Sequence, residues 1–472
     1  MNSFEVRLDT RTLAKAVRQE EWIAFLHACR WFSGKGRVIA SVRPSACCVL
    51  DSALSVAVLS VVYEPEEHED YLLPLLVGTA EETGGIAQIG GRPLLDALSR
   101  EEGWRRLLSA FGRSFHPGLD LSMRVELVGP APRQGDFRMG SVDQTNSWAI
   151  VGDLFVKAYR RLQPGENLDV EVCRFLTRRK GAHSPVLRGV LALEGEFGEA
   201  TLLSAQVAIP NQGTGWDLAR KQVAEAVEGG DPDLSPWTLL GKSMADLHRL
   251  LASDGPDAIG TLPLHPPDLE AIAKGAMALA REALVEFEHT DLSPAASGLA
   301  HLLRHRTPDL LRRIKAPRIP DGTCHRQRIH GDIHLGQVLW DGANFSIIDF
   351  EGEPGRPVEE RRRKQSPAKD LAGMLRSFDY AARAGLPAEA GQAGEILARR
   401  WRNSARKLFR TAYEDAIGGE PFLPADPVLR RDLVDLFELE KAFYELKYEM
   451  RNRPEWVEIP MAGLLDLVGS PR

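Results

Sequence analysis

The sequence predicts an α+β protein whose first part is rich in strands and whose last part is mostly helical. Short apolar stretches with strand-like patterns dominate roughly the first 215 residues, whereas apolar residues recur at helical spacing over most of the remaining chain. One β-rich stretch, 328–350, interrupts the helical region. We therefore expect three parts: an α+β cap subdomain at 1–93, a β-rich subdomain at 94–215 and a helical lobe at 216–472.

The first two parts are expected to combine strands with short helices. In the first, the periodicity predicts a helix over 13–29 and strands over 38–50, 54–63 and 71–78. Glycines at 84, 85, 90 and 91 indicate the joint with the second part. The second is predicted to hold a helix over 93–111, strands over 123–129, 147–150, 154–160 and 200–209, and a helix that Asn167 caps.

The last part is expected to be a helical lobe with one inserted hairpin. Helices are predicted over 238–251, 267–288, 295–313, 388–413 and 427–452. Within the β-rich interruption, two apolar pieces flank Asp341-Gly342-Ala343-Asn344, which is typical of a hairpin turn.

Composition excludes several classes of protein. The hydrophobic fraction of 43% is that of a globular chain, and a net charge of −7 argues against binding driven by nucleic-acid phosphates. Five cysteines form neither an even disulfide set nor a CxxC zinc motif, so a reducing compartment is expected. The N-terminus lacks a signal-peptide core, and no apolar stretch is long enough to span a bilayer. We expect a soluble cytoplasmic protein with neither membrane nor nucleic acid as partner.

One stretch carries the chemistry: His330-Gly331-Asp332, an amide at Gln337, and then Ile347-Ile348-Asp349-Phe350-Glu351 after the predicted hairpin. Mg²⁺ prefers oxygen ligands, which Gln337, Asp349 and Glu351 supply. Asp332 is placed to accept a proton from a hydroxyl nucleophile, as in phosphoryl transfer. A lone His-Gly-Asp is mostly chance, but the combination with the downstream residues is far more specific.

Phosphoryl transfer also predicts a nucleotide lobe upstream of these residues. Lys157, in a predicted strand, is expected to reach the α- and β-phosphates of ATP and to pair with Glu171 of the next helix, with Asp169 as the rival partner. The loop that covers the phosphates is expected from Gly140 to Ser147 and includes Ser141, although it has a single glycine. Backbone groups near Gln206 and Ala208 are candidates for reading the adenine edge.

The motifs together resemble the aminoglycoside phosphotransferase and eukaryotic-like kinase superfamily and, within it, the maltokinases. The matching segments are RWFSGKGR from Arg30, VKAYRRLQPGENLDVEVCRFL from Val156, IPNQGTGWDLA from Ile209, the run from Ile347 to Ala382, and ELEKAFYELKYEMRNRPEW from Glu438. They span nearly the whole chain. The resemblance implies a bilobal, protein-kinase-like fold with an N-terminal cap.

The resemblance also implies an activity and a set of roles. Maltokinases phosphorylate maltose at C1 with ATP, giving maltose 1-phosphate for α-glucan (glycogen) synthesis. The resemblance places Asp332 as the catalytic base and assigns Gln337, Asp349 and Glu351 to Mg²⁺. It also places Lys157 with Glu171 at the phosphates. The length leaves no room for a fused trehalose synthase, so a free-standing enzyme is expected, with such a synthase as a possible partner.

The helix predicted at 427–452 is the expected sugar site. Lys441, Glu445 and Tyr448 share one helical face, with Tyr444 beside them. In an arbitrary helix such residues would form a solvent-exposed face, but the resemblance to maltokinases favours a sugar site. His330 is expected to hold the catalytic loop and is also placed among the substrate-binding residues.

Other interpretations stay open from the sequence alone. A glucosamine kinase would share the fold and the phosphoryl-transfer residues, because Glu438, Glu445 or Glu449 could serve an amino sugar. An aminoglycoside phosphotransferase is more remote. An inactive sugar-binding pseudokinase would have no need for Lys157, Asp332, Gln337, Asp349 and Glu351 together.

Overall fold

The computed structural model describes residues 8–65, 67–82, 84–112, 121–133, 135–140, 145–181, 183–253, 259–294, 296–387 and 389–469. The chain divides into two compact units. The β-rich unit comprises Met1–Thr177 and Pro185–Ile209, and the helical unit comprises Arg178–Ser184 and Pro210–Arg472. The two predicted parts at 1–93 and 94–215 thus fall largely within one unit, and the predicted boundary between them stays a prediction.

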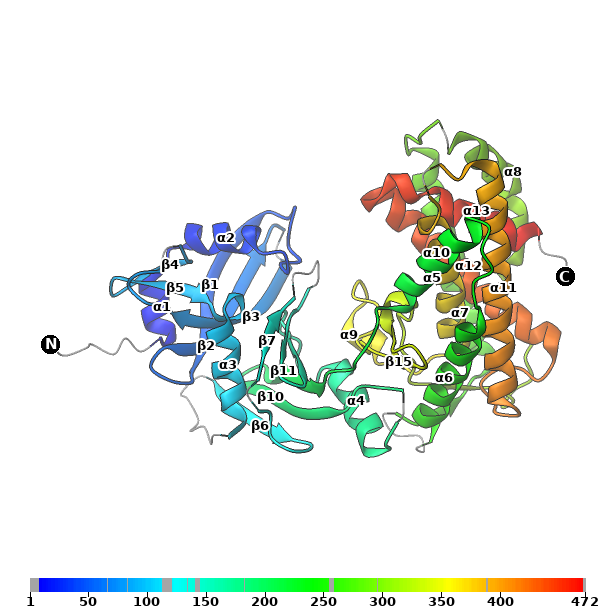
Figure 1. Cartoon of the computed structure of the whole chain (residues 1–472). Coiled ribbons are helices and arrows are strands. Elements are labelled where there is room, and N and C mark those ends of the chain that lie inside the picture. The colour runs from blue at the N-terminus through cyan, green and yellow to red at the C-terminus, as the bar shows by residue number, and fades with distance from the viewer. Residues whose placement is uncertain are drawn as a thin grey trace. The chain divides into compact units, whose positions relative to one another are not determined.

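The β-rich unit begins with an antiparallel five-stranded sheet in the order β1-β2-β3-β5-β4. Its strands are β1 (Ile39–Val49), β2 (Leu54–Tyr63), β3 (Glu67–Val77), β4 (Ala87–Ile89) and β5 (Arg92–Asp96). Helices α1 (Thr10–Ala16) and α2 (Gln19–Ala28) pack along this sheet, and Leu13, Trp22 and Leu26 are buried there (Figure 1). We call this part, residues 8–99, the cap.

A second antiparallel sheet completes the unit in the order β6-β10-β11-β9-β8-β7. Its strands are β6 (Ser122–Leu127), β7 (Phe137–Met139), β8 (Ser147–Val151), β9 (Leu154–Ala158), β10 (Leu187–Gly195) and β11 (Gly198–Val207). Two helices accompany it, α3 (Glu101–Ser109) and α4 (Leu168–Arg178).

The two sheets share one hydrophobic core. Val56 and Leu72 of the cap and Val156 and Leu203 of the second sheet belong to the same buried cluster, together with Trp104 of α3. Because burial of apolar surface is the main stabilising term in folding, the cap and the second sheet stabilise one another.

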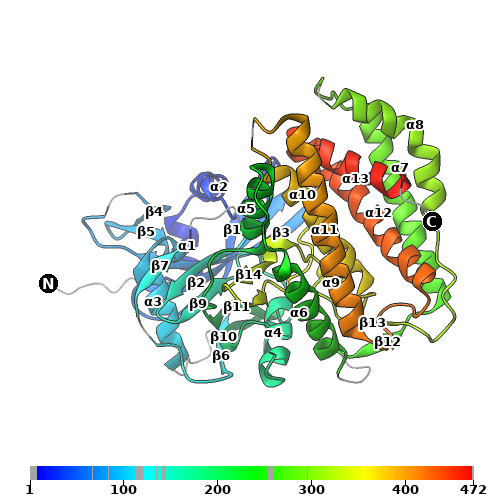
Figure 2. The ribbon, with the colours of Figure 1, turned by 45° about the vertical axis from the view of Figure 1, so that its right-hand side comes forward.

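The helical unit is built mainly from long helices that pack against one another, with one short helix, Val358–Arg361. They are α5 (Gly215–Val227), α6 (Ser235–Ala252), α7 (Pro266–Glu288), α8 (Ser297–Arg313), α9 (Val358–Arg361), α10 (Ala368–Ala384), α11 (Gly391–Ile417), α12 (Pro427–Asn452) and α13 (Glu458–Gly469). Helix α11 runs beside α6, and α12 packs against both α7 and α10 (Figure 2). No helix among the described residues is long and apolar enough to cross a membrane.

Two small hairpins complete the helical unit. One pairs β12 (Thr261–Pro263) with β13 (His325–Gln327), and the other pairs β14 (Val338–Trp340) with β15 (Phe345–Ile347). Asp341 stabilises the second turn, since its Oδ1 accepts the backbone N–H groups of Ala343 and Asn344 at 2.7 and 2.6 Å.

Most of the predicted elements are present, and the differences include the following three. The helix predicted over 13–29 is two helices, because Val17 and Arg18 adopt extended backbone. The helix predicted from 93 begins at Glu101, since Arg92–Asp96 pair as β5. Strand β10 was not predicted, although its continuous apolar run is typical of a fully buried strand.

Candidate active site

A buried carboxylate holds the loop that carries Asp332. Asp370, in the first turn of α10, accepts the backbone N–H groups of His330 and Gly331 at 2.8 and 2.9 Å, and its Oδ2 lies 3.1 Å from Nε2 of His248. These hydrogen bonds and the charge interaction with His248 outweigh the effect of burial and lower the pKa of Asp370. Gly331 adopts φ +82°, a conformation that favours glycine. The backbone of this loop is therefore held in place by a carboxylate that stays ionised.

Asp332 itself is half-buried and faces a pocket. Its Oδ1 lies 3.4 Å from Nζ of Lys441 on α12, and the same Nζ lies 3.3 Å from Oε1 of Glu353. We call Asp332, Glu353 and Lys441 the Lys441 cluster. The side chains of Asp332 and Lys441 are 25% and 29% exposed, so solvent or a ligand can reach both.

Lys441 and Glu353 are both held in their charged forms. Burial disfavours the charge on Lys441, but Asp332 and Glu353 outweigh that effect and raise its pKa above the ordinary lysine value. Burial likewise opposes ionisation of Glu353, yet Lys441 and Arg356 lower its pKa to about 2. The pocket therefore presents a fixed ammonium group between two carboxylates.

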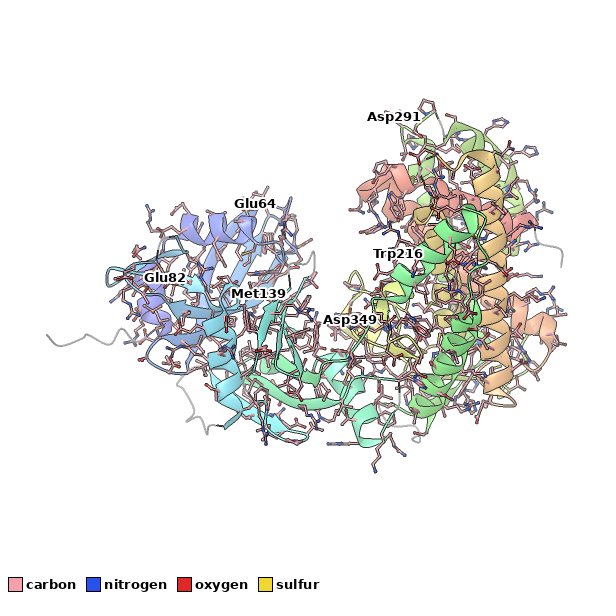
Figure 3. The ribbon with its side chains drawn as sticks, in the orientation of Figure 1. Glu64, Glu82, Met139, Trp216, Asp291 and Asp349 are labelled. Carbon is pink, nitrogen blue, oxygen red and sulfur yellow. The ribbon has the colours of Figure 1, made fainter. Side chains whose placement is uncertain are left out.

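The pocket has a volume of about 710 Å³ and is formed by residues of the helical unit. Its lining combines the Lys441 cluster with aromatic rings: Trp216, Tyr380, Tyr444, Tyr448 and Trp456. Tyr444 and Tyr448 stack with ring centroids 6.4 Å apart, as do Tyr380 and Trp456 at 6.2 Å. A smaller cavity of about 30 Å³ also borders Asp332, with room for about one water molecule. Figure 3 labels Trp216, in the first turn of α5.

Four of the predicted substrate-binding residues line this pocket: Lys441, Tyr444, Glu445 and Tyr448. Glu445 is engaged by Arg376, whose Nε and Nη2 donate to its Oε2 at 2.9 and 2.7 Å. Sequence reasoning did not single out Glu353, Trp216, Tyr380 or Trp456 for this site. Their positions depend on how distant segments pack, although all four stand in the segments that resemble maltokinases.

His330 is a correction to the prediction for the substrate site. Its side chain is buried, with Nε2 2.9 Å from the carbonyl oxygen of Ile348 and Nδ1 3.4 Å from the backbone nitrogen of Asp332. Both ring nitrogens are therefore used inside the protein, and His330 holds the loop without contacting a substrate.

Two of the predicted magnesium ligands are adjacent. Nε2 of Gln337 donates to Oδ2 of Asp349 at 2.9 Å, which leaves the side-chain carbonyl oxygen of Gln337 without a partner among the described residues. Asp349 adopts φ +68°, a strained conformation for a residue other than glycine (Figure 3). An available amide oxygen beside a carboxylate fits the oxygen preference of Mg²⁺. The described residues contain no group of three His, Cys, Asp or Glu side chains that could hold a metal.

In the β-rich unit, Lys157 lies in β9 and is 7% exposed. Ser204 pairs directly opposite it, and Tyr159 lies two residues further along the same face. Asp169 is buried next to these residues, because its Oδ2 accepts from Tyr159 Oη at 3.2 Å and from Gln206 Nε2 at 3.1 Å. The structure thus places Asp169 on the Lys157 face of the sheet. Glu171, which is partly exposed, and Asp169 both remain candidates for the ion pair.

The remaining nucleotide residues stay predictions. The Gln206 side chain is buried against Asp169, and the backbone N–H of Ala208 donates to the carbonyl oxygen of Asp153 at 2.8 Å. Any contact of these two residues with adenine would have to use other backbone groups. Ser141 lies outside the described residues.

Sequence models of two known domains match the chain. The maltokinase N-terminal cap domain matches residues 25–99, and the phosphotransferase enzyme family matches residues 170–404. Residues 170–404 thus match a phosphotransferase domain, which follows the matched cap domain. The predicted superfamily, with a maltokinase-type cap, is confirmed.

Two characterised relatives of this phosphotransferase are glucosamine kinases. That of Streptacidiphilus jiangxiensis is 29% identical over 359 residues, covering 72% of this chain and 75% of the relative. That of Mycolicibacterium smegmatis is 27% identical over 344 residues, covering 69% and 77%. The predicted enzyme class, an ATP-dependent sugar kinase that acts on an alcohol group, is confirmed.

The phosphotransferase also shares its fold with solved structures. A glucosamine kinase in complex with glucosamine, ADP and inorganic phosphate aligns with a TM-score of 0.69 and 22% identity, covering 97% of this chain and 98% of that one. A further crystal form of a glucosamine kinase aligns at 0.68. The predicted kinase-like fold with an N-terminal sheet cap and a helical C-terminal region is therefore confirmed.

Proposed function

We propose that this enzyme is a maltose 1-kinase, which transfers the γ-phosphoryl group of ATP to the C1 hydroxyl of maltose. The observation that carries the proposal is the charge balance of the aromatic pocket beside Asp332. Each of its three lining carboxylates already has a cationic partner: Asp332 has Lys441, Glu353 has Arg356 as well as Lys441, and Glu445 has Arg376.

This balance favours a neutral acceptor. An ammonium group on the substrate would approach Lys441 and would have to compete with it for a carboxylate, and like charges at such distances repel. The hydroxyl groups of a neutral sugar can donate to the carboxylates and accept from Lys441 without separating the pairs. Amphipathic aromatic rings such as Tyr444 and Tyr448 offer apolar faces to the sugar rings. The pocket volume of about 710 Å³ lies within the range of sites for small organic ligands.

The transfer step assigns a role to each residue of the catalytic loop. The acceptor oxygen attacks the γ-phosphorus, the bond from that phosphorus to the β,γ-bridging oxygen breaks, and ADP leaves. Asp332 accepts the hydroxyl proton, and Lys441 beside its Oδ1 keeps this carboxylate oriented. Lys157 of the β-rich unit binds the phosphates. Gln337 and Asp349, with Glu351, would hold Mg²⁺, which when bound neutralises charge on the β- and γ-phosphate oxygens.

A second candidate is glucosamine kinase, because the relatives that match most of the chain carry that name. It would use the same Asp332, and its substrate amine would need a carboxylate that is not already paired. Association with a trehalose synthase and a place in glycogen synthesis stay predictions.

The test is an ADP-release assay with ATP·Mg²⁺ and four separate acceptors: maltose, glucose, glucosamine and an aminoglycoside. Asp332→Asn runs beside the wild type, with Asp246→Asn as a surface control on α6. Maltose-dependent turnover that only Asp332→Asn abolishes is the expected result. Turnover with glucosamine and none with maltose would replace the proposal by the second candidate. ADP binding without turnover on any sugar would reject both.

A further inference from the structure

Two sequence motifs outside the phosphoryl-transfer residues meet inside the β-rich unit. The Arg30–Arg37 motif of the cap supplies Trp31, and the segment after β9 supplies Arg160. Arg160 is 2% exposed, and its guanidinium lies over the Trp31 ring, 4.6 Å from the centroid. Nη2 and Nη1 donate to the two oxygens of Asp96, at the end of β5, at 2.7 and 3.1 Å. Nε donates to Ser147 Oγ at 2.9 Å. We call Trp31, Asp96, Ser147 and Arg160 the Arg160 cluster.

The Arg160 cluster fixes a backbone connection between the cap and the second sheet. The N–H of Leu72 in β3 donates to the carbonyl oxygen of Arg160 at 2.7 Å, and the N–H of Leu162 donates to that of Asp70 at 2.8 Å. The chain directly after β9 therefore pairs with the central strand of the cap. A bidentate arginine–carboxylate pair adds a fixed orientation to this pairing, since both groups are planar.

A second carboxylate reinforces the same junction. Glu69 of β3 accepts from the hydroxyl groups of Tyr63 and Tyr71 at 2.9 and 2.6 Å. It also pairs with Arg37 at 3.1 Å and with Arg161 at 2.9 Å. The hydrogen bonds from Tyr71 and Tyr63 and the charge of Arg161 outweigh burial and lower the pKa of Glu69. Arg37, like Trp31, belongs to the Arg30–Arg37 motif, so both ends of that motif contact this junction.

The junction lies three residues from Lys157 along the chain. Ser147, which begins β8, pairs opposite Ala158, the residue that comes after Lys157 in β9. Arg160 thus joins the start of β8 and the end of β9 to Asp96 of the cap. A displacement of about 1 Å in a group that contacts a substrate is enough to lower activity strongly.

We propose that Arg160 is a positioning residue for the nucleotide: through Asp96 and Trp31 the cap fixes the end of β9 and thereby Lys157. The cap is then part of the nucleotide-binding apparatus and not an appended module. The inference rests on the proposed contact of Lys157 with the phosphates, but it does not depend on which sugar is the acceptor.

The experiment measures ADP·Mg²⁺ affinity of the full chain by calorimetry without any sugar. The variants are Arg160→Ala and Arg160→Lys. Arg124→Gln is the matched control: Arg124 lies in β6 of the same sheet and pairs with Glu199 at 2.6 Å, away from β9 in strand order. We expect Arg160→Ala to raise the Kd at least about tenfold and Arg160→Lys about threefold, because lysine cannot form the bidentate pair. Arg124→Gln should raise it less than about twofold.

The KM values for ATP and for the acceptor, measured separately, distinguish a positioning role from a general loss of structure. For folded variants, the KM for ATP should rise in step with the Kd while the KM for the acceptor stays within about twofold, because the acceptor pocket belongs to the other unit. If Arg160→Ala does not fold, Arg160→Lys decides the question. An Arg160→Lys protein with wild-type ADP affinity would overturn the proposal. Wild-type protein that fails to bind ADP would instead overturn the proposed function.

Discussion

The Arg160 cluster and the Lys441 cluster each pair a cation with a carboxylate, but they differ in how exposed these charged groups are. In the β-rich unit, Arg160 is 2% and Asp96 9% exposed, and their closest contact is 2.7 Å. In the helical unit, Lys441 and Asp332 are 29% and 25% exposed, and their contact is 3.4 Å. The first pair is enclosed by protein, whereas the second opens onto the pocket.

This difference in exposure distinguishes a cluster that positions the backbone from a cluster that binds a ligand. An enclosed ion pair is out of reach of a ligand, so it acts by orienting the backbone that carries it. An open, looser pair can exchange part of its contact for a ligand hydroxyl. If this distinction holds, changes in the Arg160 cluster should act on stability and on the nucleotide, whereas changes in the Lys441 cluster should act on turnover and on the acceptor.

The largest effect is expected from Asp332→Asn, which removes the proton acceptor. Turnover should fall roughly 10²- to 10⁴-fold, the usual contribution of general acid–base catalysis, while ADP affinity stays unchanged. Stability should change little, because Lys441 keeps Glu353 as its partner. Steady-state kinetics and urea unfolding check both parts; a variant with near-normal turnover would remove Asp332 from the mechanism.

The next effect is the stability lost in Arg160→Ala. Asp96 would become a buried carboxylate without its cation, and the free energy of unfolding should fall by about 3–5 kcal/mol. Urea unfolding measures this loss. The exposed pair of Arg18, which precedes α2, and Glu21 of α2 gives the control, since Arg18→Ala should cost far less stability than Arg160→Ala. Equal losses in the two variants would show that enclosure does not distinguish the Arg160 cluster.

Lys441→Gln tests the open cluster. Loss of a hydrogen bond from a charged donor should lower kcat/KM for maltose roughly 10- to 100-fold. It should also raise glucosamine turnover relative to maltose turnover, because Asp332 and Glu353 become available to an ammonium group. Lys447→Gln is the matched control on the same helix, since Lys447 pairs with Glu282 at the surface. An unchanged ratio of the two sugars would contradict the proposed role of Lys441 in selectivity.

The ionisation of Glu353 predicts a pH dependence of stability. Its pKa is about 2 in the folded protein, below the ordinary value of 4.5. A lowered folded pKa contributes stability that is present above pH 4.5 and is lost as the pH falls toward 2. Between pH 6 and pH 3 the wild type should lose about 2 kcal/mol more than Glu353→Gln does in urea unfolding. Parallel curves for the two proteins would contradict this ionisation state.

The smallest effect is expected from Tyr448→Ala. Tyr448 is 43% exposed and stacks on Tyr444, so its removal should leave the fold intact. Loss of its ring face should raise the KM for maltose roughly twofold to tenfold without changing the KM for ATP. Initial-rate kinetics with each substrate varied in turn would reveal an effect on ATP alone, which would place Tyr448 outside the acceptor site.

The sequence could reveal groups that lie close along the chain or on one helical face. Asp332, Gln337 and Asp349 surround a single hairpin, and Lys441, Tyr444 and Tyr448 follow the period of α12, so local patterns suffice to bring them together. The fold class could be inferred in the same way from the change of period along the chain.

Contacts between distant segments could not be predicted in this way. Asp96 and Arg160 are separated by 64 residues, and their pairing exists only because β3 of the cap bonds to the chain after β9. Trp216 and Trp456 reach the acceptor pocket from the two ends of the helical unit's sequence. The placement of His330 among the substrate-binding residues fails for a related reason: its spacing marks the catalytic loop, but only the contact with Ile348 shows that the ring points inward.

The most direct test of the central claim is a competition between maltose and glucosamine in one reaction with ATP·Mg²⁺, with the products identified by NMR. Both acceptors then meet the same enzyme, so the product ratio reports the ratio of their kcat/KM values. The charge balance around Lys441 predicts maltose phosphorylated on the C1 oxygen as the main product, with glucosamine largely unchanged. Glucosamine phosphate as the main product would contradict the account and make the enzyme an amino-sugar kinase.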